Sequence, residues 1–238
     1  RHAHGADVPH GAHPRRGRPR LSGAIRRVDR QRSNTCSTLR GVLQLSLFSA
    51  EARPAGIADL AGVLCGPGQI VRFGKGDQAR VSVVLADPAR AAAVTAAFAA
   101  VGVAAQAVVT ENGATAVRTA FRCDLVGLAK EWTRGAVKHV PTGWDIDGPA
   151  LRMWVLTAGR PDERGGYLLS LDPQAPHTHL PLIGALTRAG LPPARMSRSD
   201  ALRISGTRRV QRLVELVGPP PARLPVELWP RCWGRASA

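Results

Sequence analysis

The feature that most constrains this chain is an internal repeat. Residues 82–88 read SVVLADP and residues 167–173 read YLLSLDP, so an apolar extended segment runs into an Asp-Pro pair twice, 85 residues apart. VRTAF at 117–121 is followed at the same displacement by LRISG at 202–206. Internal repeats dictate the architecture before any single motif does. We therefore expect two copies of one folding unit.

Each copy is expected to run helix, two strands, helix, two strands, helix. In the first half we predict a helix over 55–64, strands over 69–73 and 80–86, a helix over 88–101, strands over 103–110 and 116–121, and a closing helix that Asp124 caps and that ends near Gly135. The second half repeats this order, with a helix start at Asp172-Pro173 and a last helix over 208–217. This pattern predicts an α/β (α+β) fold of tandem units with antiparallel sheets and a pseudo-two-fold axis.

Changes in composition divide the chain into five parts. The first residues combine His, Gly, Pro and Arg without apolar periodicity, which cannot offset the entropy of ordering a backbone. The chain begins with Arg1 and not Met, so we expect a fragment or a start placed too far upstream. The expected parts are a disordered basic arm (1–53), a first repeat (54–137), a linker (138–149), a second repeat (150–218) and a tail containing proline and tryptophan (219–238).

The chain is strongly basic, with 33 lysines and arginines against 17 acids and a formal net charge of +16. This charge favours a polyanionic partner, and nucleic acid before a membrane surface, because no basic amphipathic helix carries a broad apolar face. Only Lys75, Lys130 and Lys138 are lysines, and a GC-rich coding sequence yields an excess of arginine without selection for charge. Half of the net charge, +8, lies in residues 1–56, so the remainder is basic without being extreme.

Neither a membrane span nor cysteine chemistry is indicated. The longest apolar candidate, 41–50, is too short for a span and contains polar residues. Cys36, Cys65, Cys123 and Cys232 are scattered without the spacing of a zinc site or a disulfide framework. We expect a monomeric protein of the reducing cytoplasm, with no metal, no cofactor and no membrane partner.

The leading helix contains the nine residues LAGVLCGPG, from Leu60 to Gly68, which we call the first signature segment. It resembles the signature of the LAGLIDADG homing endonucleases, in which the signature helix opens a unit with this same order of helices and strands. Lys138-His139-Val140-Pro141 looks like the linker of that family. The resemblance spans about 55–220 and implies that two signature helices pack together, with small residues allowing close approach. The expected contact residues are Leu60, Ala61, Gly62, Trp154 and Val155.

In that family, an acid at the end of each signature helix holds a divalent metal that activates water for phosphodiester hydrolysis. Pro67 stands in its place in the first copy and has no side-chain oxygen for Mg²⁺. In the second copy two registers are open: over 151–159 an alanine replaces the acid, and over 155–163 Asp162 keeps it. We expect no efficient double-strand cleavage. Asp162 and Glu163 are the catalytic candidates for any nicking, which would need Mg²⁺.

Strand alternation sorts the basic residues by face. In the strand over 80–86 it turns the apolar residues toward the helices and Arg80 outward, and in the strand over 116–121 it turns Val117, Thr119 and Phe121 inward. The resemblance implies DNA binding on the outward face, where guanidinium groups can bond phosphate or guanine in a bidentate manner. The expected nucleic-acid contacts are Arg72, Lys75, Arg80, Arg118, Arg122, Arg195 and Arg203.

These observations predict a protein that binds double-stranded DNA on a degenerate homing-endonuclease scaffold. It is distantly similar to sporulation regulators of the WhiA type, although their helix-turn-helix module has no counterpart in 219–238. Two alternatives stay open: an active Mg-dependent endonuclease or nickase, and an RNA- or protein-binding module with no nuclease ancestry. Aromatic residues make up only 4% of the chain, which argues against single strands because their binders stack bases on aromatic platforms.

Overall fold

The computed structural model describes residues 49–50 and 53–232, which belong to one unit spanning Leu43–Ala238. The expected N-terminal arm, 1–53, lies almost entirely outside the described residues, as do Cys36 and Trp233. Among the described residues we find no helix with the length and apolar character that a bilayer crossing requires.

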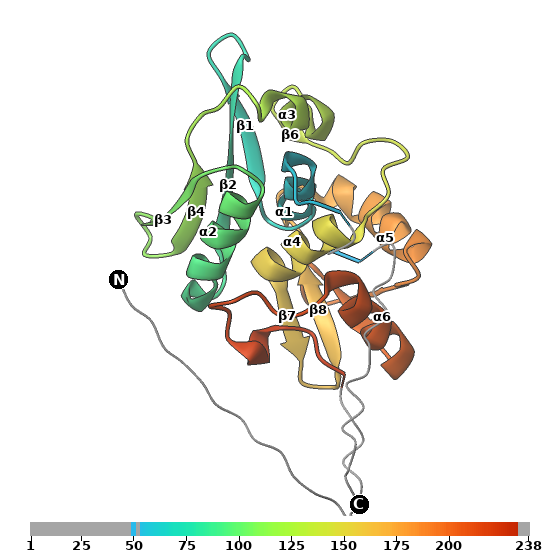
Figure 1. Cartoon of the computed structure of the whole chain (residues 1–238). Coiled ribbons are helices and arrows are strands. Elements are labelled where there is room, and N and C mark those ends of the chain that lie inside the picture. Colours follow the sequence, from blue (N-terminus) through green and yellow to red (C-terminus); the bar gives the residue numbers. More distant parts are fainter. Residues whose placement is uncertain (1–48, 51–52, 233–238) are drawn as a thin grey trace, which may run out of the picture. The chain divides into compact units, whose positions relative to one another are not determined.

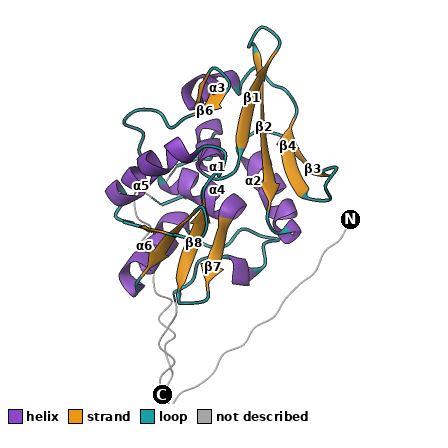
Figure 2. Cartoon of the chain, turned by 180° about the vertical axis from the view of Figure 1, so that it is seen from behind, coloured by secondary structure: helices purple, strands orange, loops and turns teal. Residues whose placement is uncertain are grey.

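The first half forms an antiparallel sheet with helices on one face. Its elements in chain order are η1 (Ile57–Leu60), α1 (Ala61–Cys65), β1 (Gln69–Phe73), β2 (Gln78–Leu85), η2 (Pro88–Arg90), α2 (Ala91–Ala100), β3 (Ala105–Val109), β4 (Thr115–Thr119) and α3 (Val126–Trp132). As predicted, the Asp87 side chain caps η2, where it accepts a hydrogen bond from the amide of Ala89. α2 lies against β3 and β4 and covers one face of the sheet, in front of it in Figure 1 and behind it in Figure 2.

The second half follows a short hairpin of β5 (Thr133–Arg134) and β6 (Val137–Lys138). Its elements are α4 (Gly148–Ala158), β7 (Gly159–Asp162), β8 (Gly166–Ser170), η3 (Pro176–Thr178), α5 (His179–Arg188), β9 (Ala194–Arg195), β10 (Ala201–Ser205), α6 (Thr207–Val217) and η4 (Val226–Leu228). The tail returns to the folded body, because Trp229 is buried and its indole nitrogen donates to the carbonyl oxygen of Gly218 over 2.9 Å.

The two four-stranded sheets have the same strand order, β1-β2-β4-β3 and β7-β8-β10-β9. Ser82 on β2 pairs with Arg118 on β4, and Leu168 on β8 pairs with Arg203 on β10. Arg118 and Arg203 are matched in the repeat, so their partners Ser82 and Leu168 hold equivalent places in the two sheets. These partners are 86 residues apart, whereas the repeated letters align at a displacement of 85 residues. A shift of one residue turns every side chain of a strand to the other face, so the repeated letters of this strand match residues that lie on opposite faces of the two sheets. The predicted α/β architecture with antiparallel sheets is confirmed, and its origin by duplication stays a prediction.

The two halves meet where α1 and α4 lie side by side (Figure 1). The approach is closest at Gly62, where an added Cβ would lie 1.8 Å from the carbonyl oxygen of Ala150 and 2.9 Å from Cβ of Met153. The neighbouring Leu60 and Trp154 are fully buried in the core that both halves share. Only a residue without a side chain fits at position 62 as the two backbones now lie.

Two expected helix starts differ in the structure. Asp124 does not cap α3, which has no side-chain cap, because its carboxylate pairs with Arg122. No helix begins at Asp172-Pro173, and the first helical turn starts at Pro176 instead. The Asp172 carboxylate accepts a hydrogen bond from the backbone N–H of Gln174 and forms a buried ion pair with Lys138, so it caps no helix.

Candidate nucleic-acid interface

The face of the first sheet opposite the helices, which we call the first open face, carries two of the expected arginines. Val81 and Val83 are buried on the helix side of β2, so alternation places Arg80 on the open face. Arg118 pairs across the sheet with Ser82, lies on the same face and is exposed. The strand residues on this face, none of them acidic, are Gln69, Val71, Phe73, Gln78, Arg80, Ser82, Val84, Gln106, Val108, Ala116 and Arg118.

Arg80, Gln106, Arg118 and Phe121 line a hollow of about 340 Å³ on this face. The Arg80 guanidinium carbon lies 4.7 Å from the centroid of the Phe121 ring, and that ring lies 4.9 Å from the ring of Phe73. A guanidinium held over an aromatic face is oriented by the negative charge of the ring face. The hollow therefore presents two guanidinium groups and one amide, which are the groups that bond phosphates and base edges.

Phe121 and Arg122 lie on the faces opposite to those predicted. Arg122 exchanges both backbone hydrogen bonds with Ala79, a residue buried on the helix side. One extra residue separates this pair from the regular ladder of β2 and β4, and such a bulge reverses the alternation. The Arg122 guanidinium accordingly pairs with Asp124 and donates to the carbonyl oxygen of Gly102 at the end of α2. Arg122 is therefore not on the open face.

Arg72 and Lys75 also lie away from the first open face. Arg72 pairs with Ala79, so its side chain leaves β1 on the side opposite to Arg80. Lys75 lies in the turn between β1 and β2. Both residues are exposed and line a separate hollow with Gly135 of the β5–β6 turn.

The corresponding face of the second sheet, the second open face, is less basic. Arg203 pairs with Leu168 and lies there as predicted, but its Nε is 2.5 Å from Oδ2 of Asp162. This ion pair is largely shielded from water, with the side chains 23% and 13% exposed. Arg160 on β7 also pairs with Leu168 and is exposed, so it is a basic residue of this face that strand alternation in the sequence did not reveal.

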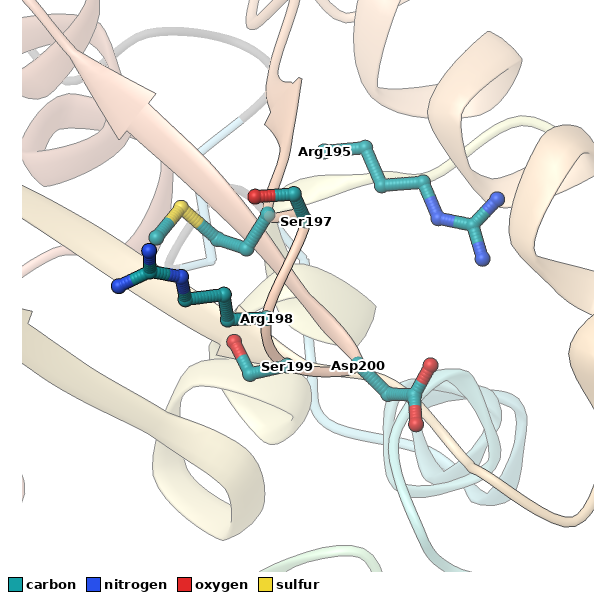
Figure 3. A pocket seen from close by; sticks show the side chains of 6 residues that line it. Arg195, Ser197, Arg198, Ser199 and Asp200 are labelled. Carbon is teal, nitrogen blue, oxygen red and sulfur yellow. The ribbon is translucent and has the colours of Figure 1, made fainter.

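Arg195 lies at the edge of the second sheet on the helix side, because it pairs with the buried Leu202. It begins a loop, 195–200, that surrounds a hollow of about 520 Å³. Figure 3 shows Arg195 and Arg198 extending to opposite sides of this loop. Three of the expected arginines therefore lie on the open faces of the two sheets, and three lie on the helix side. The first three are Arg80, Arg118 and Arg203, and the others are Arg72, Arg122 and Arg195.

The sheet register selects one of the two alignments left open for the second half. Ser82 pairs with Gln69, which follows the first signature segment, and its counterpart Leu168 pairs with Arg160. The matching segment therefore ends before Arg160 and covers 151–159, which we call the second signature segment. Its eighth residue is alanine, where the first segment has proline. Neither side chain has an oxygen atom.

Asp162 lies beyond the end of α4 and not at its last turn. A signature segment over 155–163 would need helix through residues that form β7. The Asp162 carboxylate is bound to Arg203, and the neighbouring Glu163 is exposed in the turn before β8. Neither Asp162 nor Glu163 therefore lies at the end of a helix.

A buried lysine holds the turn between α1 and β1. The ammonium of Lys138 donates to the carbonyl oxygens of Gly66 at 2.8 Å and Gly68 at 2.9 Å, and it lies 2.6 Å from Oδ2 of Asp172. The Lys138 and Asp172 side chains are 4% and 2% exposed. Burial lowers the pKa of Lys138, while the hydrogen bond and charge of Asp172 oppose that shift. Burial raises the pKa of the nearby Cys65 thiol, and the lysine charge partly offsets it.

A buried arginine binds the last turn of α4 and the glycine that follows it. Arg90, 3% exposed, donates to the carbonyl oxygens of Val155 and Leu156 at 3.1 and 2.7 Å and also to that of Gly159. The negative end of a helix dipole favours a cation at this position. Burial raises the pKa of the adjacent Tyr167 to about 12, and Arg90 lowers it by a smaller amount.

Comparison with known proteins identifies the fold. The sequence matches no protein-family model and no curated protein. Among solved structures, it is similar to that titled "The homing endonuclease I-WcaI bound to its DNA recognition sequence". The likeness covers 67% of this chain and 78% of that chain, with a TM-score of 0.50 and 12% sequence identity. The fold is of the homing-endonuclease type.

The helix ends of this homing-endonuclease-type fold do not fit the divalent metal that the resemblance implies. Mg²⁺ needs hard oxygen ligands such as carboxylates, and Pro67 and Ala158 supply none. The nearby carbonyl oxygens already accept hydrogen bonds from Lys138 and Arg90. Within the described residues, no three side chains of His, Cys, Asp or Glu lie close enough together to hold a metal ion.

Proposed function

We propose that this protein binds duplex DNA on its open sheet faces and does not cleave it efficiently. The observation that carries the proposal is the first open face, where Arg80 and Arg118 lie beside Gln106 and no strand residue is acidic. The similar homing endonuclease is bound to its DNA recognition sequence. The two signature segments are then degenerate LAGLIDADG helices, and residues 54–137 and 150–218 are the two repeats.

Arginine geometry favours duplex DNA over the alternatives. Arg80 and Arg118 occupy neighbouring strands of a twisted sheet, which can follow the major groove, whereas the deep, narrow major groove of an RNA helix admits no side chains. The proposed contacts are therefore Arg80 and Arg118, with Arg160 and Arg203 on the second open face. Arg72, Arg122 and Arg195 lie on the helix side of their sheets and are not included.

A salt titration with matched variants tests the proposal. Affinity for a pool of random duplex DNA should fall as salt rises. The double substitution Arg80→Gln/Arg118→Gln should reduce the slope of log K against log salt by about 1.8, because each phosphate that an arginine no longer neutralises accounts for about 0.9. Arg212→Gln is the matched control because Arg212 lies on α6 and pairs with Glu215. Equal binding of RNA duplexes of the same length, or an unchanged slope in the double variant, would contradict the proposal.

Cleavage is tested separately. We expect a supercoiled plasmid to remain intact with the wild-type protein and Mg²⁺, because neither signature segment carries an acid at its eighth position. Nicking that Asp162→Ala abolishes and Glu163→Ala does not would show that the Asp162 carboxylate takes part in cleavage despite its pairing with Arg203.

A further inference from the structure

The buried cations at the ends of α1 and α4 are the feature that DNA binding leaves unexplained. The last residue of the first signature segment, Gly68, presents its carbonyl oxygen to the Lys138 ammonium, and the last residue of the second, Gly159, presents its carbonyl oxygen to the Arg90 guanidinium. The two glycines hold the same place in the two halves, as the sheet register shows. A buried cation therefore binds the equivalent carbonyl oxygen in the segment that follows each of the two helices.

Each cation also links one half to the other. Arg90 belongs to the first half and closes α4 of the second. At the other end, Asp172 follows β8 of the second half and holds Lys138 against the end of α1 in the first. The side-chain amide Nε2 of Gln69 donates to the same Asp172 oxygen over 2.6 Å. The loop after β2 thus binds the end of α4 directly, and the loop after β8 holds the lysine that binds the turn after α1.

The chemistry at Lys138 fits a monovalent ammonium. An ammonium group has three N–H donors and no acceptor, and three oxygen atoms lie within 2.9 Å of Nζ: two carbonyl oxygens and one carboxylate oxygen. Their single formal negative charge matches the single positive charge. Mg²⁺ would require near-octahedral coordination at a shorter distance and retains several waters, which a side-chain pair at most 4% exposed leaves little room to admit.

We propose that Lys138 and Arg90 are built-in cations that hold the end of each paired helix against the opposite half, so that the helix ends of this chain need no divalent ion. In this protein the cation at each helix end comes from the polypeptide itself. The proposal concerns folding and ion binding. Its test uses no DNA, so it can fail while the proposed function stands, and the reverse.

The first experiment needs no variant. The melting temperature of the wild-type chain should be the same, within about 1 °C, in EDTA and in Mg²⁺ or Ca²⁺ at matched ionic strength, because an ion that binds only the folded state would raise it. A saturable rise with either divalent ion would overturn the proposal.

The second experiment removes the lysine and supplies a substitute. Lys138→Ala should lower the melting temperature by roughly 10 °C, because it leaves a buried carboxylate without its partner. Alanine keeps Cβ, so n-propylammonium supplies the missing atoms and should restore part of the loss in a saturable manner. Tetramethylammonium, which has no N–H donor, should restore none. Equal effects of the two ions, or an equal effect of propylammonium on the exposed-lysine control Lys130→Ala, would overturn the proposal.

A third variant pair keeps the test decisive if Lys138→Ala does not fold. Lys138→Met retains most of the side-chain volume and should lower the melting temperature. Adding Asp172→Leu should recover most of that loss, because the double variant buries no unpaired charge. If the two substitutions lower the melting temperature additively, the charges are not coupled and the proposed role of the lysine is wrong.

Discussion

The packing of α1 against α4 yields the sharpest prediction about stability. Gly62→Ala adds one methyl group at a point where Cβ would lie 1.8 Å from the carbonyl oxygen of Ala150 and 2.7 Å from its carbonyl carbon. Both atoms belong to the backbone, so no rotamer change relieves the overlap and the two helices must separate. Overpacking of a core typically costs about 1–3 kcal/mol when side chains can adjust. We therefore expect a loss of about 3 kcal/mol or more.

Urea denaturation followed by tryptophan fluorescence measures this loss. Gly127→Ala in α3 is the matched control, because an added Cβ at Gly127 would meet no atom within 4 Å. That variant should be more stable than the wild type by about 0.5–1 kcal/mol, since alanine loses less backbone entropy than glycine in a helix. If Gly62→Ala unfolds at the wild-type urea concentration, the two helices do not approach as closely as the structure places them.

Three further predictions follow from buried groups. Tyr167 is the single tyrosine and its pKa is raised to about 12, so its phenolate absorbance should appear near pH 12 and not near 10; because the folded state keeps the proton longer than the unfolded state, stability should fall as pH rises from about 10 to 12. A midpoint near 10 in the folded protein would contradict this. Cys65 is fully buried with its pKa raised, so maleimide labelling followed by peptide mapping should modify Cys123 and Cys232 much faster; equal rates would show that Cys65 is accessible. Trp229→Ala should destabilise the chain by about 3–5 kcal/mol in urea denaturation, because it empties a buried site; a change below about 1 kcal/mol would mean that the tail does not pack on the body.

The sequence determined the strand and helix order because local patterns encode it. Alternation identified the inward valines of β2 and therefore the outward Arg80. The same rule failed for Phe121 and Arg122, because a bulge adds one residue that no local pattern reveals. Arg72 and Arg195 were also expected on the outward face and lie on the helix side, because an edge strand leaves room for an exposed arginine on either face.

The tertiary structure alone decided what closes the central helices. Pro67 showed from the sequence that the first helix end lacks an acid, but two registers for the second half remained open until the pairing of β7 with β8 selected 151–159. The roles of Lys138 and Arg90 had no signal in the sequence, because their partners are mainly backbone carbonyl oxygens of segments 65–72 residues away. Every residue carries such an oxygen, so only the folded chain determines which ones a buried cation meets.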